Sequence, residues 1–249
     1  MKKVFLFFLV VVGLSCKRQE ATLTAQQIVD KSIAVSGGLL YENATINFDF
    51  RDRSYTSVQQ NKKRTLNRLL KNDTIKILDT YTTTTFERKV NDSVIHITDS
   101  LATTYGNSVN SVHYFSKLPY GLNDRAVHKE LMKETTIEGK HYYKVKVTFS
   151  QQDGGDDFDD TYIYFFNKNT FKPDFLAYDF HVDGGGMRFR KAYNERYING
   201  IRFVDYNNMK PIDENASILQ IDSLFNNDRL KLLSKIELKA ISVNQDNYN

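Results

Sequence analysis

The sequence predicts a mainly β protein with a few helices, in which about eleven antiparallel strands form one curved, unclosed half-barrel around an inserted helix. Segments with apolar residues at every second position recur along the chain, and aromatic residues make up 13% of it. Strands are not regularly followed by helices, which argues against a parallel α/β fold. Consecutive antiparallel strands must protect their edges, so a sheet that curls around the inserted helix is the economical arrangement.

The chain begins with a segment typical of an export signal. Lys2 and Lys3 precede the apolar run Val4 to Val12, and the only cysteine of the 249 residues follows as Cys16. The run is shorter than the ~20 residues that a membrane-spanning helix needs, but it fits a signal peptide. The residues before Cys16 resemble a lipobox, which implies that Cys16 becomes acylated. The alternatives are an ordinary signal peptide with a coincidental cysteine, or a short buried helix.

Composition limits the remaining classes. One cysteine excludes an intramolecular disulfide framework and a Cys-based zinc cluster. A balance of 34 basic to 30 acidic residues is too even for a nucleic-acid protein. We expect a signal peptide at residues 1–15, a tether at 16–23, one domain at 24–243 and a frayed tail at 244–249. We expect a monomer without a cofactor.

The first element of the domain is a helix over Ala25 to Ser36. Thr24 and Gln27 have the spacing of a capping box. Gly37 and Gly38 follow as a left-handed stop.

Strands follow this helix. Alternation and turn residues predict them at 46–50, 65–70, 74–81, 86–90 and 93–98. Leu101, Tyr105, Val109 and Val112 then recur at helical spacing, so residues 100–118 are predicted to form the inserted helix.

The second half of the chain is predicted to be almost entirely strand. Strands are expected at 127–137, 143–149, 161–167, 175–182, 187–198, 201–209 and 232–243, with a short helix at 222–226. Asn199 and Gly200 form the strongest hairpin signal.

An acidic loop is one candidate site. Five aspartates fall within eight residues, and they are Asp153, Asp156, Asp157, Asp159 and Asp160. Carboxylates on a flexible loop can hold Ca²⁺ or Mg²⁺, but the spacing does not fit an EF-hand. We favour a solvated hairpin loop here and expect no metal.

A glycine-rich hairpin is the other candidate. If residues 175–182 pair with 187–198, then Gly184, Gly185 and Gly186 form the connection, and His181, Asp183, Arg188 and Arg190 gather near one edge. The histidine and aspartate are candidates for acid–base catalysis. The glycines and arginines are candidates for binding a carboxylate or phosphate. A glycine turn with ordinary surface charges is the alternative.

The order of elements resembles the bacterial LolA/LolB-like lipoprotein-carrier superfamily. The resemblance rests on QQIVDKSIAVSGGLLY (26–41) and LKLLSKIELKAISV (230–243). Residues 142–211, with DGGDDFDDTYIYFF, HVDGGGMRFRKAYN and NGIRFVDYNNMKP, look like an uncharacterised family of bacterial surface or periplasmic lipoproteins. The carrier resemblance implies an unclosed β-barrel with helices on its concave side.

These observations lead to one functional expectation and two alternatives. We expect a lipoprotein that acyl chains on Cys16 hold in the bacterial envelope, at the outer membrane, facing the periplasm or the surface. It would bind a lipid or other hydrophobic ligand in the half-barrel, among aromatic residues of the sheet. The alternatives are an envelope hydrolase or lyase with its site at the glycine-rich hairpin, and a module that docks a protein partner.

Overall fold

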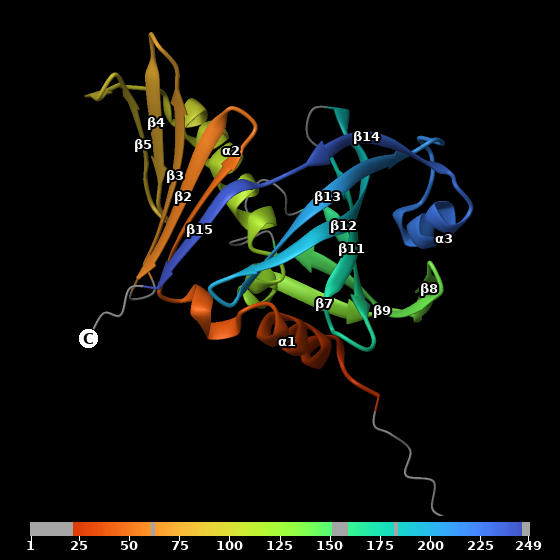
Figure 1. Cartoon of the computed structure of the whole chain (residues 1–249). Coiled ribbons are helices and arrows are strands. Elements are labelled where there is room, and N and C mark those ends of the chain that lie inside the picture. Colours follow the sequence, from red (N-terminus) through yellow and green to blue (C-terminus); the bar gives the residue numbers. More distant parts are fainter. Residues whose placement is uncertain (1–21, 61–62, 151–158, 182–183, 246–249) are drawn as a thin grey trace, which may run out of the picture.

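The computed structural model describes residues 22–60, 63–150, 159–181 and 184–245. Within these ranges two antiparallel sheets lie on either side of helix α2 (Asp99–Ser116), and helix α1 (Ala25–Val35) packs near strand β7 at the bottom of Figure 1. Helix α2 contacts β3, β4 and β5 of one sheet, while Phe115 near its end contacts Tyr162 and Tyr178 of the other. The inserted helix therefore fills the space between the sheets.

Sheet 1 has the strand order β15-β1-β2-β3-β4-β5-β6, and β1 to β6 are successive hairpins. Its strands are β1 (Ala44–Phe50), β2 (Arg53–Gln60), β3 (Lys63–Lys71), β4 (Lys76–Tyr81), β5 (Phe86–Val90), β6 (Ser93–Val94) and β15 (Lys239–Gln245).

Sheet 2 has the order β14-β13-β12-β11-β10-β9-β7, with β8 paired to β9. Its strands are β7 (Val127–Leu131), β8 (Thr135–Ile137), β9 (Lys140–Phe149), β10 (Thr161–Asn167), β11 (Pro173–Phe180), β12 (Gly186–Ile198), β13 (Ile201–Pro211) and β14 (Leu230–Ile236). Its central strands are buried on both faces. Tyr164 packs in the cluster that includes α1, whereas Phe165 packs with residues of α3 (Ile221–Asn226). This explains why β10 is apolar at nearly every position.

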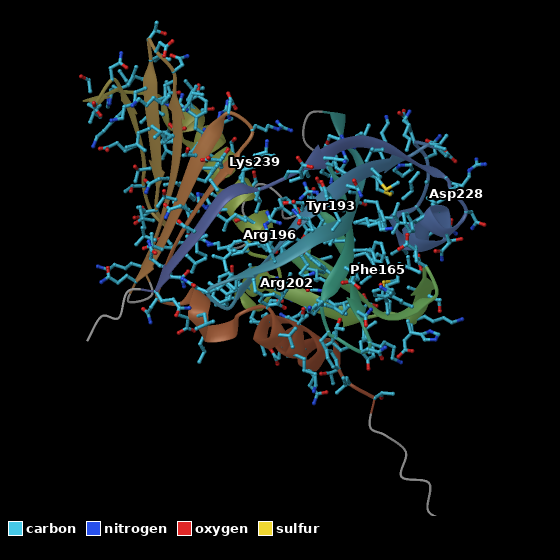
Figure 2. All side chains as sticks on the ribbon, in the orientation of Figure 1. Phe165, Tyr193, Arg196, Arg202, Asp228 and Lys239 are labelled. Atoms are coloured by element: carbon cyan, nitrogen blue, oxygen red, sulfur yellow. The ribbon has the colours of Figure 1, made fainter. Side chains whose placement is uncertain are left out.

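The two sheets are joined where β14 ends and β15 begins. At this corner the Asp205 Oδ1 accepts a hydrogen bond from the backbone N–H of Leu238 (3.0 Å), and Arg196 Nη2 donates to the Leu238 carbonyl (2.7 Å). Arg196 Nη2 and Asp205 Oδ1 are also an ion pair at 2.9 Å. These bonds replace the sheet ladder at Leu238, so the chain can leave sheet 2 and enter sheet 1 (Figure 2). The predicted single strand at 232–243 is thus two strands in different sheets.

The predicted first helix is confirmed as α1. The N–H of Gln27 donates to Thr24 Oγ1 (3.2 Å), and the N–H of Thr24 donates to Gln27 Oε1 (2.9 Å), which is the predicted capping box. Ile28 and Val29 are fully buried, so the apolar stripe of the helix faces the core.

The predicted fold class is confirmed. The protein is mainly β, α2 is the inserted helix, and the described edge strands β6 and β7 do not pair, so the sheets do not close into a barrel. The strand pattern differs in detail, with fifteen described strands in two sheets. Strand β2 escaped prediction because its buried positions are Tyr55 and Ser57, of which only one is apolar. The predicted strand at 127–137 is split into β7 and β8.

Candidate functional site

A cavity of about 310 Å³ lies where α2, strands β11 to β14 and the turn after β1 meet. We call it the inter-sheet cavity. Most of its lining is apolar or aromatic, namely Phe50, Val112, Phe115, Tyr178, Val204, Tyr206, Ile236 and Leu238. The polar lining residues are Arg51, Ser111, Ser116, Arg190, Asn208 and Ser234. Ligand pockets typically measure ~300–1,000 Å³ and combine an apolar lining with a few polar groups, so this cavity has the character of a small-molecule site.

Strand alternation and register place the polar groups of sheet 2 in one row. Arg190 on β12 lies opposite Asn208 on β13, and Asn208 lies opposite Ser234 on β14. Asn208 Nδ2 donates to Ser234 Oγ at 3.1 Å, whereas the Asn208 Oδ1 is buried and has no hydrogen-bond partner. The cavity therefore has a polar strip along one wall and apolar surroundings.

Arg190 is the charged centre of this strip. It is only 8% exposed. Its guanidinium carbon lies 3.9 Å from the centroid of the Phe115 ring, and its Nη2 donates to the Tyr178 hydroxyl at 2.9 Å. Its Nε is buried without a hydrogen-bond partner, and no carboxylate of the described residues forms an ion pair with it. A buried charge without a partner costs free energy, so Arg190 destabilises the folded chain unless a further group pairs with it.

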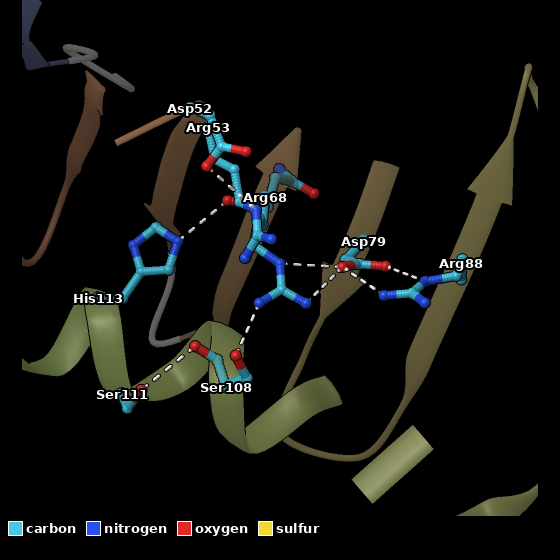
Figure 3. A network of polar contacts seen from close by, with 9 residues as sticks. Asp52, Arg53, Arg68, Asp79, Arg88, Ser108, Ser111 and His113 are labelled. Atoms are coloured by element: carbon cyan, nitrogen blue, oxygen red, sulfur yellow. Dashed lines mark hydrogen bonds and ion pairs between the residues drawn. The ribbon is translucent and has the colours of Figure 1, made fainter. Parts of the chain in front are cut away.

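A different arrangement surrounds the arginines of sheet 1. Arg68, Asp79 and Arg88 lie directly opposite one another on β3, β4 and β5. Arg68 Nη2 lies 2.7 Å from Asp79 Oδ2, and Arg88 Nε lies 2.7 Å from Asp79 Oδ1 (Figure 3). Arg68 Nη1 also donates to Ser108 Oγ of α2 at 2.8 Å. A second hollow, of about 290 Å³, adjoins these residues. Each of the two arginines has the Asp79 carboxylate as a partner, so we assign the cluster to holding α2 against sheet 1.

Two more ionisable groups of α2 and its C-terminal end are buried nearby. His113 is fully buried, its Nε2 lies 3.1 Å from the Asn67 carbonyl oxygen, and burial lowers its pKa to about 3. The imidazole is therefore neutral, and Nε2–H donates to Asn67. Burial lowers the pKa of Lys117 to about 7. Neither residue lines the inter-sheet cavity.

The glycine-rich hairpin pairs as the sequence predicts. Phe180 on β11 lies opposite Gly186 on β12, and residues 184–186 all have positive φ (86°, 74° and 143°), which explains the three glycines. Arg188 lies beside the turn with its guanidinium 4.9 Å from the Phe180 ring centroid. The structure therefore separates the two arginines, because Arg190 lines the inter-sheet cavity and Arg188 does not.

The other residues of this hairpin lie at its exposed end. The His181 side chain is 67% exposed, and its Nδ1 is 3.5 Å from Asp160 Oδ1. Asp183 lies outside the described residues. The catalytic roles of His181 and Asp183, and ligand contacts by Gly184, Gly185, Gly186 and Arg188, stay predictions.

The remaining predicted positions fall partly outside the described ranges. These are Cys16 and three aspartates of the acidic loop, Asp153, Asp156 and Asp157. Asp159 is exposed, whereas Asp160 is buried near His181. Within the described ranges no three His, Cys, Asp or Glu side chains gather as metal ligands. No helix of the described chain has the length and apolarity to cross a membrane.

Sequence reasoning missed most of the cavity. Ser234 offered a usable signal, because it is a polar residue between Leu232 and Ile236 on one strand face, whereas Asn208 lies between Tyr206 and Lys210 and is less distinctive. Phe115 and Ile236 offered none, since any buried residue of a helix or strand has the same pattern.

Two comparisons with families and characterised proteins bear on identity. The model of a protein family described as "Family of unknown function (DUF6503)" matches residues 2–238. No curated protein matches the chain.

Solved structures give further likenesses. A DUF1329 family protein from Desulfovibrio piger aligns with a TM-score of 0.51 at 11% identity, covering 92% of this chain and 95% of that chain. A LolA superfamily protein from Nitrosomonas europaea has a TM-score of 0.47 at 11% identity, over 90% and 92% of the two chains. A putative outer membrane lipoprotein-sorting protein domain from Vibrio parahaemolyticus has a TM-score of 0.42 at 8% identity, over 89% and 94%. At such identity the first likeness shows a shared fold.

Proposed function

The chain belongs to the DUF6503 family, and we propose that it binds a hydrophobic ligand in the inter-sheet cavity. The observation that carries the proposal is the lining. Apolar and aromatic side chains from both sheets and from α2 line a cavity of about 310 Å³. Removing apolar surface from water contributes ~25 cal/mol per Å². An apolar ligand therefore gains more from this cavity than a polar one of the same size.

The proposal extends to location. We propose that the protein is a monomeric lipoprotein of the bacterial envelope, held at the outer membrane by acyl chains on Cys16. The support is the lipobox-like segment that ends in the only cysteine of the chain. Two or more acyl chains anchor a protein stably, because each buried methylene contributes ~0.8 kcal/mol.

The anchor is tested by the mass of the N-terminal peptide of the protein isolated from cell membranes. We expect a peptide that begins at Cys16 and carries the added mass of acyl chains. A peptide that begins at another residue, or an unmodified Cys16, would show that the anchor is wrong.

Ligand binding is tested with the full chain carrying Cys16→Ser, which cannot be acylated. An uncharged dye such as N-phenyl-1-naphthylamine becomes more fluorescent in apolar surroundings, so its titration reports the cavity. Ile236→Trp places a large ring in the cavity lining, whereas Leu232→Trp changes an exposed position of the same strand. We expect Ile236→Trp to abolish most of the fluorescence gain and Leu232→Trp to leave it unchanged. Equal binding by both variants would place the ligand elsewhere.

A further inference from the structure

We infer that the ligand of the inter-sheet cavity is a single-chain amphiphile with an anionic head, whose carboxylate or phosphate oxygens bind Arg190 while its apolar tail lies among the aromatic and aliphatic residues. This inference rests on the proposed function, because it names the class of ligand for the same cavity. Its starting point is the charge of the lining. The cavity is lined by two arginines, Arg51 and Arg190, and by no acidic residue among those that the structure describes.

Arg190 brings a positive charge into the cavity lining. An arginine cannot lose its proton inside a protein, whereas a buried lysine can. Lys117 illustrates the difference, since burial lowers its pKa to about 7. Arg190 is 8% exposed, and the centroid of an aromatic ring lies 3.9 Å from its guanidinium carbon. Its charge must therefore be balanced by hydrogen bonds or by a counter-ion.

The described residues provide no carboxylate partner for the positive charge of Arg190. The other buried arginines have carboxylate partners, Arg68 with Asp79 at 2.7 Å and Arg202 with Glu195 at 2.6 Å. Arg190 has the Tyr178 hydroxyl and two aromatic rings instead, and its Nε–H remains without an acceptor. A neutral hydroxyl and ring faces balance a cation less well than a carboxylate does.

The polar strip lies next to Arg190. Asn208 lies directly opposite Arg190, and its buried Oδ1 accepts no hydrogen bond. The described chain therefore leaves one donor of Arg190 and one acceptor of Asn208 unused, on two cross-strand neighbours that both line the cavity. A phosphate or other acidic head that carries a hydroxyl can accept from Arg190 and donate to Asn208.

The rest of the lining is suited to the apolar tail. The strip belongs to β12, β13 and β14, and the rest of the wall is formed by apolar residues such as Val112, Val204 and Ile236. About 310 Å³ is at the lower end of ligand-pocket volumes, which favours one chain over several. Arg51, an exposed residue of the turn after β1, adds a second positive charge to the lining.

The experiment compares three ligands with the same tail. Dodecanoate, dodecyl phosphate and dodecanol each displace the uncharged dye from the full Cys16→Ser chain, below the concentrations at which they form micelles. We expect the two anions to bind at least about tenfold more tightly than dodecanol, as a charge-assisted hydrogen bond in a buried site implies.

In Arg190→Met we expect that preference for the anions to disappear, while dodecanol keeps its affinity. Arg190→Lys, which retains the charge, should keep part of the preference, and Arg229→Met, at an exposed arginine outside the lining, should keep all of it.

Each other result has a definite meaning. Equal affinity for dodecanol and dodecanoate in the unmodified cavity would overturn the anionic head and leave the hydrophobic ligand standing. Displacement by none of the three ligands would overturn the proposed function itself. Displacement by acetate or inorganic phosphate at the same concentrations would show an anion site that needs no tail, and would overturn the amphiphile. Urea unfolding midpoints near that of the parent chain identify the Arg190 variants that are folded.

Discussion

Two rows of side chains, one on each sheet, face α2, and each contains a buried arginine. The arginine of sheet 1 has a carboxylate partner, whereas that of sheet 2 has none among the described residues. In sheet 1 the row contains Arg68, Asp79 and Arg88 in direct cross-strand register. In sheet 2 the row contains Arg190, Asn208 and Ser234, and none of them is acidic. Both arginine-bearing rows touch the same helix, since Arg68 bonds to Ser108 and Arg190 stacks on Phe115. The difference is one acidic residue, and it separates a structural contact from a candidate ligand contact.

The energetic consequence follows from burial. Breaking a buried ion pair by removing one partner is strongly destabilising, because the other charge is left in a poor medium. A buried charge that already lacks a partner has little pairing energy to lose. Variants in the two rows should therefore affect stability very differently, and four experiments test whether they do.

The largest effect is expected for Asp79→Ala in sheet 1. This change leaves Arg68 and Arg88 facing each other without the carboxylate, and Arg68 is 6% exposed. We expect the free energy of unfolding in urea to fall by ~3–5 kcal/mol. The control is the double variant Asp79→Leu with Arg68→Met, which removes the carboxylate together with its more buried partner, leaves only the more exposed Arg88 unpaired, and should lose clearly less. A loss below ~1 kcal/mol for Asp79→Ala would mean that the cluster does not hold α2.

The next effect is a pH dependence on the sheet 1 side of α2. Burial lowers the pKa of His113 to about 3 in the folded protein, while an unfolded chain has a histidine pKa of ~6.5. As pH falls below ~6.5 the unfolded chain takes up a proton that the folded protein refuses, so stability is lost by ~1.4 kcal/mol per pH unit until about pH 3. Urea unfolding of the parent and of His113→Phe at pH 7 and pH 5 measures this difference.

The control for that experiment is His96→Phe, at an exposed histidine. Its stability should follow that of the parent protein between pH 7 and pH 5. If His113→Phe also follows the parent, the imidazole is not buried as described.

A smaller effect tests how closely α2 packs on sheet 1. A Cβ atom at Gly106 would lie 2.9 Å from ring atoms of Tyr81. Overpacking costs ~1–3 kcal/mol, and alanine returns up to ~1 kcal/mol of helix propensity. We therefore expect Gly106→Ala to lose ~1 kcal/mol. Ser111→Ala, on the same helix but in the cavity lining, should change stability by less than ~0.5 kcal/mol. Equal losses would mean that the two sides of α2 are packed alike.

The smallest effect is expected for Arg190→Met in sheet 2. Replacing a buried unpaired charge by an apolar side chain of similar length is close to neutral, although the contact with Phe115 is weakened. We expect the free energy of unfolding to stay within ~1 kcal/mol of the parent value in the absence of ligand. A loss as large as that of Asp79→Ala would show that Arg190 is a structural residue and that the two rows do not differ in kind.

Short-range chemistry let the sequence determine much of the secondary structure. Thr24 and Gln27 form a capping box because they lie three residues apart on any helix that starts there. Asn199 and Gly200 turn β12 into β13 because both have positive φ (45° and 81°), which this residue pair tolerates well. The alternation of β9 and the helical spacing in α2 likewise depend on near neighbours alone.

The cavity and its lining could not be predicted from local sequence patterns. Arg188 and Arg190 have the same chemistry and the same parity on one strand, yet only Arg190 lines the inter-sheet cavity, because the cavity is placed by Phe50, Phe115 and Ile236 from distant parts of the chain. The corner at Leu238 depends in the same way on Asp205, which lies on another strand. Local patterns specify which segments form strands and helices, but a cavity and the charge within it depend on which segments meet, and that is set by packing over the whole chain.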